Sequence, residues 1–264
     1  MTLRSMSRTI ILIAAGNIGL LYAPAPIFAQ ERECSVPERF YVSEPQLTKT
    51  PKAIVHGQES VIVVLGGAST LSIAAGKPDL AWPARFAAAV AERFPSAHIR
   101  VVNLAVARQT AKQAAERLDR EVIPMKPNLV IWETGTMEAV RGMDIDEFRE
   151  TLRAGIDELR TAGIETVLMN MQFSRDSEAV IHFEPYLAAM SQLADASDVL
   201  LFRRHGMMRH WAESGFLDLR VSDSDQRRRV AAKLYDCIGR AMADFVMRGS
   251  PGANSPPVKA GSAR

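Results

Sequence analysis

The sequence predicts one α/β domain built on a five-stranded parallel sheet with helices on both faces. Two observations lead to this prediction. Apolar, strand-like runs alternate with amphipathic helical segments over residues 59–248, as in successive β-α-β units. The first run, Val61 to Leu65, is apolar at every position, which is typical of a strand covered on both sides. Such a three-layer α/β/α arrangement belongs to the flavodoxin-like class of doubly wound sheets.

Each element of this pattern has its own signature. The expected strands are short apolar runs, at residues 60–66, 98–104, 128–133, 164–169 and 198–202. The expected helices have apolar residues at three- and four-residue spacing, and they cover residues 79–94, 110–122, 144–162, 178–194, 203–213 and 222–247. Asp144 or Asp146 is the expected N-cap of the long central helix, and Gly163 follows its end. With 47% hydrophobic and 23% charged residues, the chain can form one sizeable core.

Both ends of the chain are expected to lie outside this domain. A basic start precedes an apolar stretch from Ile10 to Tyr22, which is shorter than the roughly 20 residues of a membrane span. We interpret residues 1–29 as a cleaved signal peptide and the protein as periplasmic or secreted, with an uncleaved signal anchor as the alternative. Residues 30–58 are expected to form an irregular lead-in, and residues 249–264, rich in Pro, Gly, Ser and Ala, a disordered tail.

Export changes the interpretation of the two cysteines, Cys34 and Cys237. An even number of cysteines in an oxidising compartment favours a disulfide between them, and two free buried thiols are the alternative. The net charge of +2 is too small to indicate a nucleic-acid partner. No cysteines, histidines or carboxylates stand at metal-ligand spacing, and no lysine follows the first glycines as in a phosphate-binding loop. No cofactor, metal or stable membrane span after signal cleavage is therefore expected.

Four motifs lie at strand ends and before the last helix. Gly66 to Thr70 (Gly-Gly-Ala-Ser-Thr) resembles a Gly-Asp/Ser-Ser-x-Thr block, and Asn103 to Arg108 resembles Asn-x-Gly-x-x-Gly. Gly135 to Glu138 resembles Gly-x-Asn-Asp, and Leu217 to Asp223 resembles Asp-x-x-His followed by a helix start. These are the blocks of the SGNH (GDSL) hydrolases, which the chain resembles over nearly its whole mature length. The resemblance implies a flavodoxin-like fold and an origin among exported or cytoplasmic esterases.

The framework of that family is matched, whereas its chemistry is not. By the resemblance, Ala68 replaces the nucleophilic serine, and Ala105 replaces the glycine whose N–H binds the oxyanion. Met137 replaces the asparagine donor, and Arg220 replaces the histidine base. Alanine has no nucleophilic atom, a thioether donates no hydrogen bond, and arginine stays protonated. The preferred interpretation is an exported protein with a degenerate esterase site that binds or scaffolds a small acylated or carbohydrate ligand.

Two alternatives stay open. If the glycine turn is shifted by one residue, Ser69 is the nucleophile of an active serine esterase or polysaccharide O-acetyl-handling enzyme. Asp218 and a displaced His205 or His210 would then support it; otherwise Ser69 and Thr70 are expected to cap the segment that follows them. The other alternative is a purely structural envelope protein without a pocket. The other residues expected to line a pocket are Gly66, Gly67, Asn103, Gly135, Thr136 and His205.

Overall fold

The computed structural model of the 264-residue chain describes residues 34–41 and 46–248. It confirms an α/β domain with five parallel strands in the order β2-β1-β3-β4-β5. The strands are β1 Glu59–Leu65, β2 His98–Asn103, β3 Leu129–Glu133, β4 Glu165–Met169 and β5 Leu200–Phe202. The strand order reverses between β1 and β3, the position where doubly wound sheets bind ligands. The predicted signal peptide and tail lie outside the described residues.

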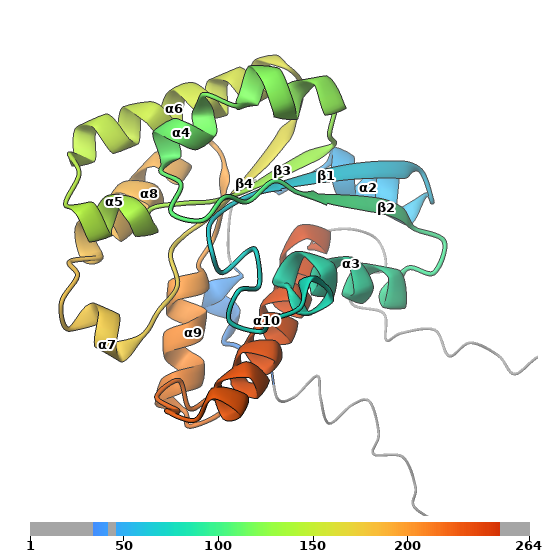
Figure 1. Cartoon of the computed structure of the whole chain (residues 1–264). Helices are drawn as coiled ribbons and strands as arrows, with labels where there is room; N and C mark the ends of the chain where they lie inside the picture. Colours follow the sequence, from blue (N-terminus) through green and yellow to red (C-terminus); the bar gives the residue numbers. More distant parts are fainter. Residues whose placement is uncertain (1–33, 42–45, 249–264) are drawn as a thin grey trace, which may run out of the picture.

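Helices cover both faces of the sheet (Figure 1). They are α2 Lys49–Val55, α3 Trp82–Arg93, α4 Ala111–Ala115, α5 Thr136–Arg141, α6 Ile145–Thr161, α7 Arg175–Glu178, α8 Glu184–Ala196, α9 Arg204–Glu213 and α10 Ser224–Met247. In Figure 1, α4, α6 and α8 lie on one face, whereas α3 and α10 lie on the other. Within the described ranges, no helix is both long and apolar enough to cross a membrane.

The uninterrupted apolar pattern of β1 follows from this layering. Ile62 and Val64 belong to the core cluster under α3 and α10. Val63 and Leu65 belong to the other cluster, under α4, α6 and α8. Because successive side chains of a strand point to opposite faces, a strand buried on both sides needs apolar residues at every position.

The stretch 30–58 was predicted to be irregular, but its described part contains helix α2. The carboxylate of Glu165, at the start of β4, accepts hydrogen bonds from the backbone N–H groups of Thr48, Lys49 and Thr50, at 2.8, 2.9 and 2.7 Å. Pro51 is tolerated because it lies in the first turn of the helix. The residue that caps α2 comes from a distant strand, so the local sequence contains no sign of it.

Two predicted helices are shorter than expected, and a proline explains the later start of the second. Helix α4 ends at Ala115, and the chain continues through a π turn and a 3₁₀ turn that contains Pro124. Pro124 lacks the N–H that a regular helix would need there. Helix α8 begins at Glu184 instead of residue 178, with Pro185 in its first turn, a favoured position. Helix α5, which directly follows β3, was not predicted.

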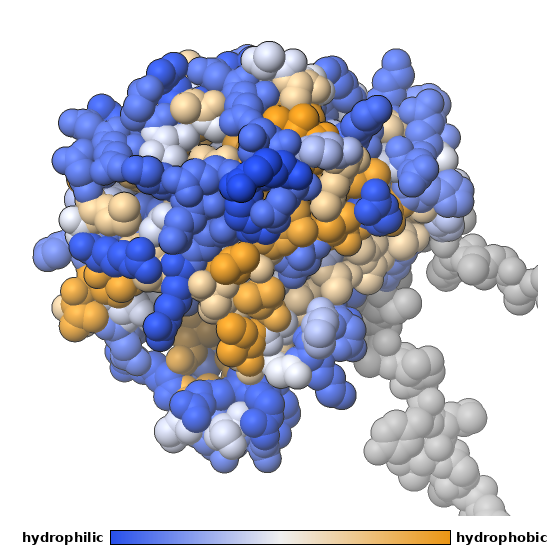
Figure 2. Space-filling model, turned by 45° about the horizontal axis from the view of Figure 1, so that its top comes forward, coloured by the Kyte–Doolittle hydropathy of each residue, from blue (hydrophilic) through white to orange (hydrophobic). Residues whose placement is uncertain are grey.

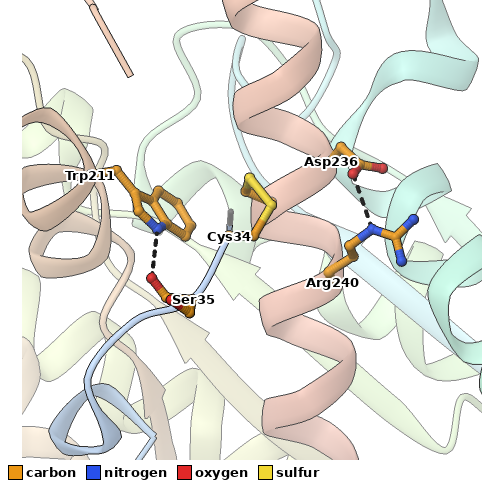
Figure 3. Close-up of a disulfide and its surroundings, with 6 residues drawn as sticks. Cys34, Ser35, Trp211, Asp236 and Arg240 are labelled. Atoms are coloured by element: carbon orange, nitrogen blue, oxygen red, sulfur yellow. Dashed lines mark hydrogen bonds and ion pairs between the residues drawn. A yellow bond between two sulfur atoms is a disulfide. The ribbon is translucent and has the colours of Figure 1, made fainter. Parts of the chain in front are cut away.

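The structure confirms the disulfide between Cys34 and Cys237, whose Cα atoms are 5.1 Å apart (Figure 3). Cys237 is fully buried on α10. Next to the disulfide, the Trp211 indole N–H donates to the Ser35 carbonyl oxygen at 3.3 Å. Together these contacts fix the segment after Cys34 against α9 and α10.

Candidate functional site

The carboxyl ends of β1 and β3 meet in a tightly packed turn. A side chain at Gly66 would place its Cβ 2.5 Å from the Thr70 hydroxyl oxygen and 3.0 Å from Glu133 Oε2, so only glycine fits there. Gly67 has no such constraint, because a Cβ built at that position meets nothing within 4 Å. The motif that follows β1 is therefore shaped by a carboxylate at the end of β3.

The hydroxyl of Ser69 lies between two charged side chains. It donates a hydrogen bond to Glu133 Oε1 at 2.7 Å and accepts one from Arg204 Nη1 at 3.0 Å. Arg204 Nη2 also donates to Glu133 Oε1 at 3.0 Å. The side chains of Arg204 and Glu133 are only 1% and 5% exposed, so Ser69 is bound to a buried ion pair.

Thr70 and Asn103 extend this network to the end of β2. The Thr70 hydroxyl donates to Glu133 Oε2 and accepts from the Trp82 indole N–H at 3.1 Å. The Asn103 side-chain amide donates to the Thr70 carbonyl oxygen at 2.8 Å. The hydroxyls of Ser69 and Thr70 thus bond to Glu133 rather than capping the segment that follows them. Gly66, Ser69 and Asn103 come together as the sequence predicted, but around a charge that it did not predict.

The four positions that the resemblance aligns with the family's catalytic groups differ in environment. Ala68 is exposed, Met137 is half-buried on α5, and Arg220 is exposed. Ala105 is 9% exposed, and its backbone N–H donates to Asn103 Oδ1 at 3.1 Å. The N–H that would bind an oxyanion in the family is therefore already hydrogen-bonded within the protein.

The turn after β3 is held by a buried carboxylate. Gly135 has a φ of +92°, a left-handed conformation that favours glycine, and Thr136 begins α5 directly after it. Glu138, which is 1% exposed, accepts hydrogen bonds from the backbone N–H groups of Gly135 and Ala111, at 3.1 and 2.5 Å. Glu138 thereby joins the start of α5 to the start of α4.

Around Arg220 the structure differs from the predicted serine-esterase arrangement. The residue three positions before Arg220, where the Asp-x-x-His spacing requires a carboxylate, is Leu217, which is 3% exposed. Asp218 is exposed, and its carboxylate accepts the backbone N–H of Arg220 at 2.9 Å. The Asp218 carboxylate is thus engaged in a turn of its own loop.

Arg220 lines a pocket of about 210 Å³. The walls of this pocket come from residues 173–176, after β4, from Ala212 at the end of α9, and from Gly215 and residues 217–220 between α9 and α10. Ala68, Ala105 and Met137 are not among its lining residues. The pocket at Arg220 therefore has different walls from those that the sequence predicted.

In the part of the chain that the structure describes, neither His205 nor His210 is bonded to Ser69: His205 lies next to Glu178, and His210 packs against Phe40. His205 Nε2 lies 3.2 Å from Glu178 Oε1, close enough for an ion pair but not aligned for a hydrogen bond. Burial lowers the pKa of His205 below its ordinary value, and the nearby Glu178 only partly opposes this. The ring of His210 packs against Phe40, with 6.2 Å between centroids. No hydrogen bond or ion pair among the described residues joins either histidine to Ser69.

Glu133 and Arg204 are the site residues that the sequence analysis missed. Glu133 ends an otherwise apolar strand, and Arg204 starts a helix directly after another strand. A charged residue at the end of a buried strand is a usable signal, because such a charge needs a partner. Among the described residues, no group of three or more His, Cys, Asp or Glu side chains could hold a metal ion.

Several solved structures share this fold. The esterase EstA from Pseudoalteromonas sp. is 18% identical, with a TM-score of 0.52 over 69% of this chain and 98% of that chain. The acetylxylan esterase Axe2 from Geobacillus stearothermophilus, as a catalytic mutant, is 19% identical, with a TM-score of 0.52 over 67% and 92%. LAE5, an alpha/beta hydrolase from the metagenome of Lake Arreo, is 19% identical, with a TM-score of 0.54 over 69% and 95%. At these identities the similarity concerns the fold alone.

None of the curated proteins is similar enough in sequence to match this chain. The Non-GDSL lipase-like family, by contrast, matches residues 33–251, which include every strand and helix described above. The parallel sheet, the motifs at its carboxyl edge and this match agree with one another: the chain belongs to the Non-GDSL lipase-like family and has the fold of the SGNH/GDSL hydrolases.

Proposed function

We propose that this protein is an exported, non-hydrolysing member of its family that binds a small acylated or carbohydrate ligand. The observation that carries the proposal is the position of the Ser69 hydroxyl between Glu133 and Arg204. A serine nucleophile needs a base that accepts its proton and an oxygen that faces the substrate. Here the charge of the acceptor, Glu133, is already compensated by Arg204. The neighbouring position, Ala68, is exposed but has no nucleophilic atom.

Three further observations support the other parts of the proposal. The disulfide between Cys34 and Cys237 suits an oxidising compartment, in agreement with export. The fold is shared with an acetylxylan esterase, and an acetylated carbohydrate is the class of ligand that a related but inactive site would retain. Arg220 adds an exposed cation at a pocket, which suits polar or anionic groups on such a ligand.

The experiment compares hydrolysis and covalent labelling. Purified mature protein is incubated with p-nitrophenyl acetate and with a serine-reactive phosphonate probe, beside Ser69→Ala as the matched control. We expect wild type and control to be equally inactive and equally unlabelled. Labelling of the wild type that disappears in Ser69→Ala would contradict the proposal and identify an active esterase. The observation that favours this second function is the 2.7 Å hydrogen bond from Ser69 to a carboxylate.

A reconstruction tests the alignment behind the proposal. The variant combines four substitutions: Ala68→Ser, Met137→Asn, Leu217→Asp and Arg220→His. Circular dichroism checks its folding. We expect phosphonate labelling at position 68, since these changes supply a nucleophile, a donor and an acid–base pair. A folded variant that stays unlabelled would count against the alignment.

Ligand binding is tested separately by calorimetry with acetylated and deacetylated xylo-oligosaccharides and with short acyl esters. We expect binding that depends on the acyl group. If none of these probes binds to the folded protein, the purely structural interpretation is preferred instead.

A further inference from the structure

Exposed large hydrophobic side chains are concentrated at one edge of the sheet. Among the described residues, they are Leu71, Ile73, Val106, Val140 and Val180, with exposed fractions of 37, 62, 44, 50 and 78%. Each follows the carboxyl end of a strand: two follow β1, and one each follows β2, β3 and β4. Single exposed hydrophobic residues are ordinary, but they are normally scattered over the surface. Their restriction to one edge indicates a surface that contacts something apolar.

Backbone hydrogen bonds place three of these residues around the turn that contains Ala68. Val106 N–H donates to the Gly66 carbonyl oxygen at 2.9 Å, and Leu71 N–H donates to that of Gly67 at 3.2 Å. Ile73 N–H donates to the carbonyl oxygen of Ala68 itself, at 3.4 Å.

Helix α5, which carries Val140, is attached to the loop after β2, which carries Val106. The contact is a hydrogen bond from Arg141 Nη2 to the Arg108 carbonyl oxygen at 3.4 Å. We name Leu71, Ile73, Val106 and Val140 the apolar rim. Figure 1 shows the loop between β1 and α3 in front of the sheet, and Figure 2 shows hydrophobic residues exposed on that side among hydrophilic ones.

Exposed cations stand in the same segments. They are Lys77 in the loop after β1, Arg108 in the loop after β2, and Arg141 at the end of α5. The exposed carboxylates of these segments are Asp79 and Asp144, and Asp144 is engaged as the N-cap of α6. The surface therefore combines protruding aliphatic side chains with a small excess of positive charge.

We propose that the apolar rim docks on the surface of a lipid bilayer with anionic headgroups. Aliphatic side chains on loops can enter the acyl boundary, while neighbouring lysine and arginine side chains stay at the headgroups. A second copy of the chain fits less well, because a two-fold interface would bring the same positively charged surface of both copies together. The apolar rim is also built of exposed side chains from two loops and helix α5, and none of them is more than two-thirds buried. This docking is independent of whether any ester is hydrolysed.

The test is flotation of the mature protein with vesicles. One set contains phosphatidylglycerol and phosphatidylcholine in equal parts, and the other contains phosphatidylcholine alone. We expect binding to the anionic vesicles that decreases in 0.5 M salt, since salt screens exposed charges. Free glycerol phosphate should not compete, because it lacks the acyl layer. Failure to float with anionic vesicles, or full competition by glycerol phosphate, would overturn the proposal.

Matched variants locate the contact. Leu71→Ser combined with Ile73→Ser removes two exposed aliphatic groups and should weaken binding at least about tenfold. Lys77→Gln combined with Arg108→Gln should weaken binding to the anionic vesicles, whereas Lys52→Gln, on α2 at the opposite edge, should not. Thermal unfolding checks that all variants are folded.

Two results would contradict this assignment: equal flotation of all variants, or concentration-dependent dimerisation that Leu71→Ser with Ile73→Ser abolishes. The first would place the lipid contact elsewhere, and the second would make the occupant another copy of the chain.

Discussion

The Ser69 hydroxyl oxygen lies 2.7 Å from Glu133 Oε1, although the two residues are 64 positions apart in the sequence. This hydrogen bond joins the loop after β1 to the end of β3 at the place where the strand order reverses. Arg204, from the start of α9, completes the contact from a third element. The Ser69 hydroxyl, next to Ala68 in the sequence, is therefore part of the internal structure of the protein.

The ion pair between Glu133 and Arg204 leads to the first prediction. Arg204→Met leaves the buried Glu133 carboxylate without a counter-charge, so the free energy of unfolding should fall by about 3–5 kcal/mol. Combining it with Glu133→Gln removes that charge and should recover part of the loss. Urea unfolding of Arg204→Met, Glu133→Gln and the double variant measures this. A double variant that loses the sum of the two single losses would contradict the coupling. Ser69→Ala alone should cost about 1 kcal/mol.

Glu165 leads to a prediction about pH. Burial tends to raise the pKa of its carboxyl, but hydrogen bonds from Lys49, Thr50 and Thr48 outweigh burial and hold it below the ordinary value of 4.5. A folded-state pKa below the unfolded value means that the stabilisation is fully present above the unfolded pKa. It is then lost as the pH falls through the folded pKa.

At pH 7, the free energy of unfolding of Glu165→Gln should accordingly be about 1 kcal/mol lower than that of the wild type. The difference should shrink as the pH is lowered below 4.5, because the wild type then loses the same charge. Chemical unfolding at pH 7, 5, 4 and 3 checks this. A difference that grows towards acid pH would show that the pKa of Glu165 is raised rather than lowered.

The disulfide closes most of the chain into one loop, since Cys34 and Cys237 are 203 positions apart. Replacing both cysteines with alanine should lower the free energy of unfolding by about 2–5 kcal/mol. Adding a reductant to the wild type should give a similar loss, and it should leave the double variant unchanged. If the reductant destabilises the wild type and the double variant equally, its effect is not caused by reduction of this disulfide, and the prediction is wrong.

Gly155 on α6 leads to a packing prediction. A Cβ at this position would lie 2.6 and 2.7 Å from two ring carbons of the buried Trp132. Gly155→Ala should therefore destabilise the protein by about 1–3 kcal/mol, although alanine favours helices. Trp132→Phe removes the part of the ring that is in the way. The double variant should thus lose less than the two single variants together, as measured by thermal unfolding. Strictly additive losses would contradict the steric explanation.

Much of the fold could be predicted from local patterns. The run from Val61 to Leu65 indicated a strand covered on both faces, and the structure places its alternate residues in two cores. The disulfide could be predicted from cysteine number and compartment. Helix α2 could not, because its cap, Glu165, lies 115 positions from Thr50. Helix α5 was also missed, since a short helix directly after a strand carries little periodicity.

By itself, the sequence determined the α/β class and the parallel sheet, because alternation and glycine turns are local properties. Only the tertiary structure decided what Ser69 does. Its partners, Glu133 and Arg204, are 64 and 135 positions away. A buried charge needs a partner nearby in space, and that partner can lie anywhere in the sequence. The sequence pattern therefore does not predict which residues form the pair. The same holds for the apolar rim, whose side chains come from the loops after β1 and β2 and from helix α5, and lie at one edge because parallel strands end there.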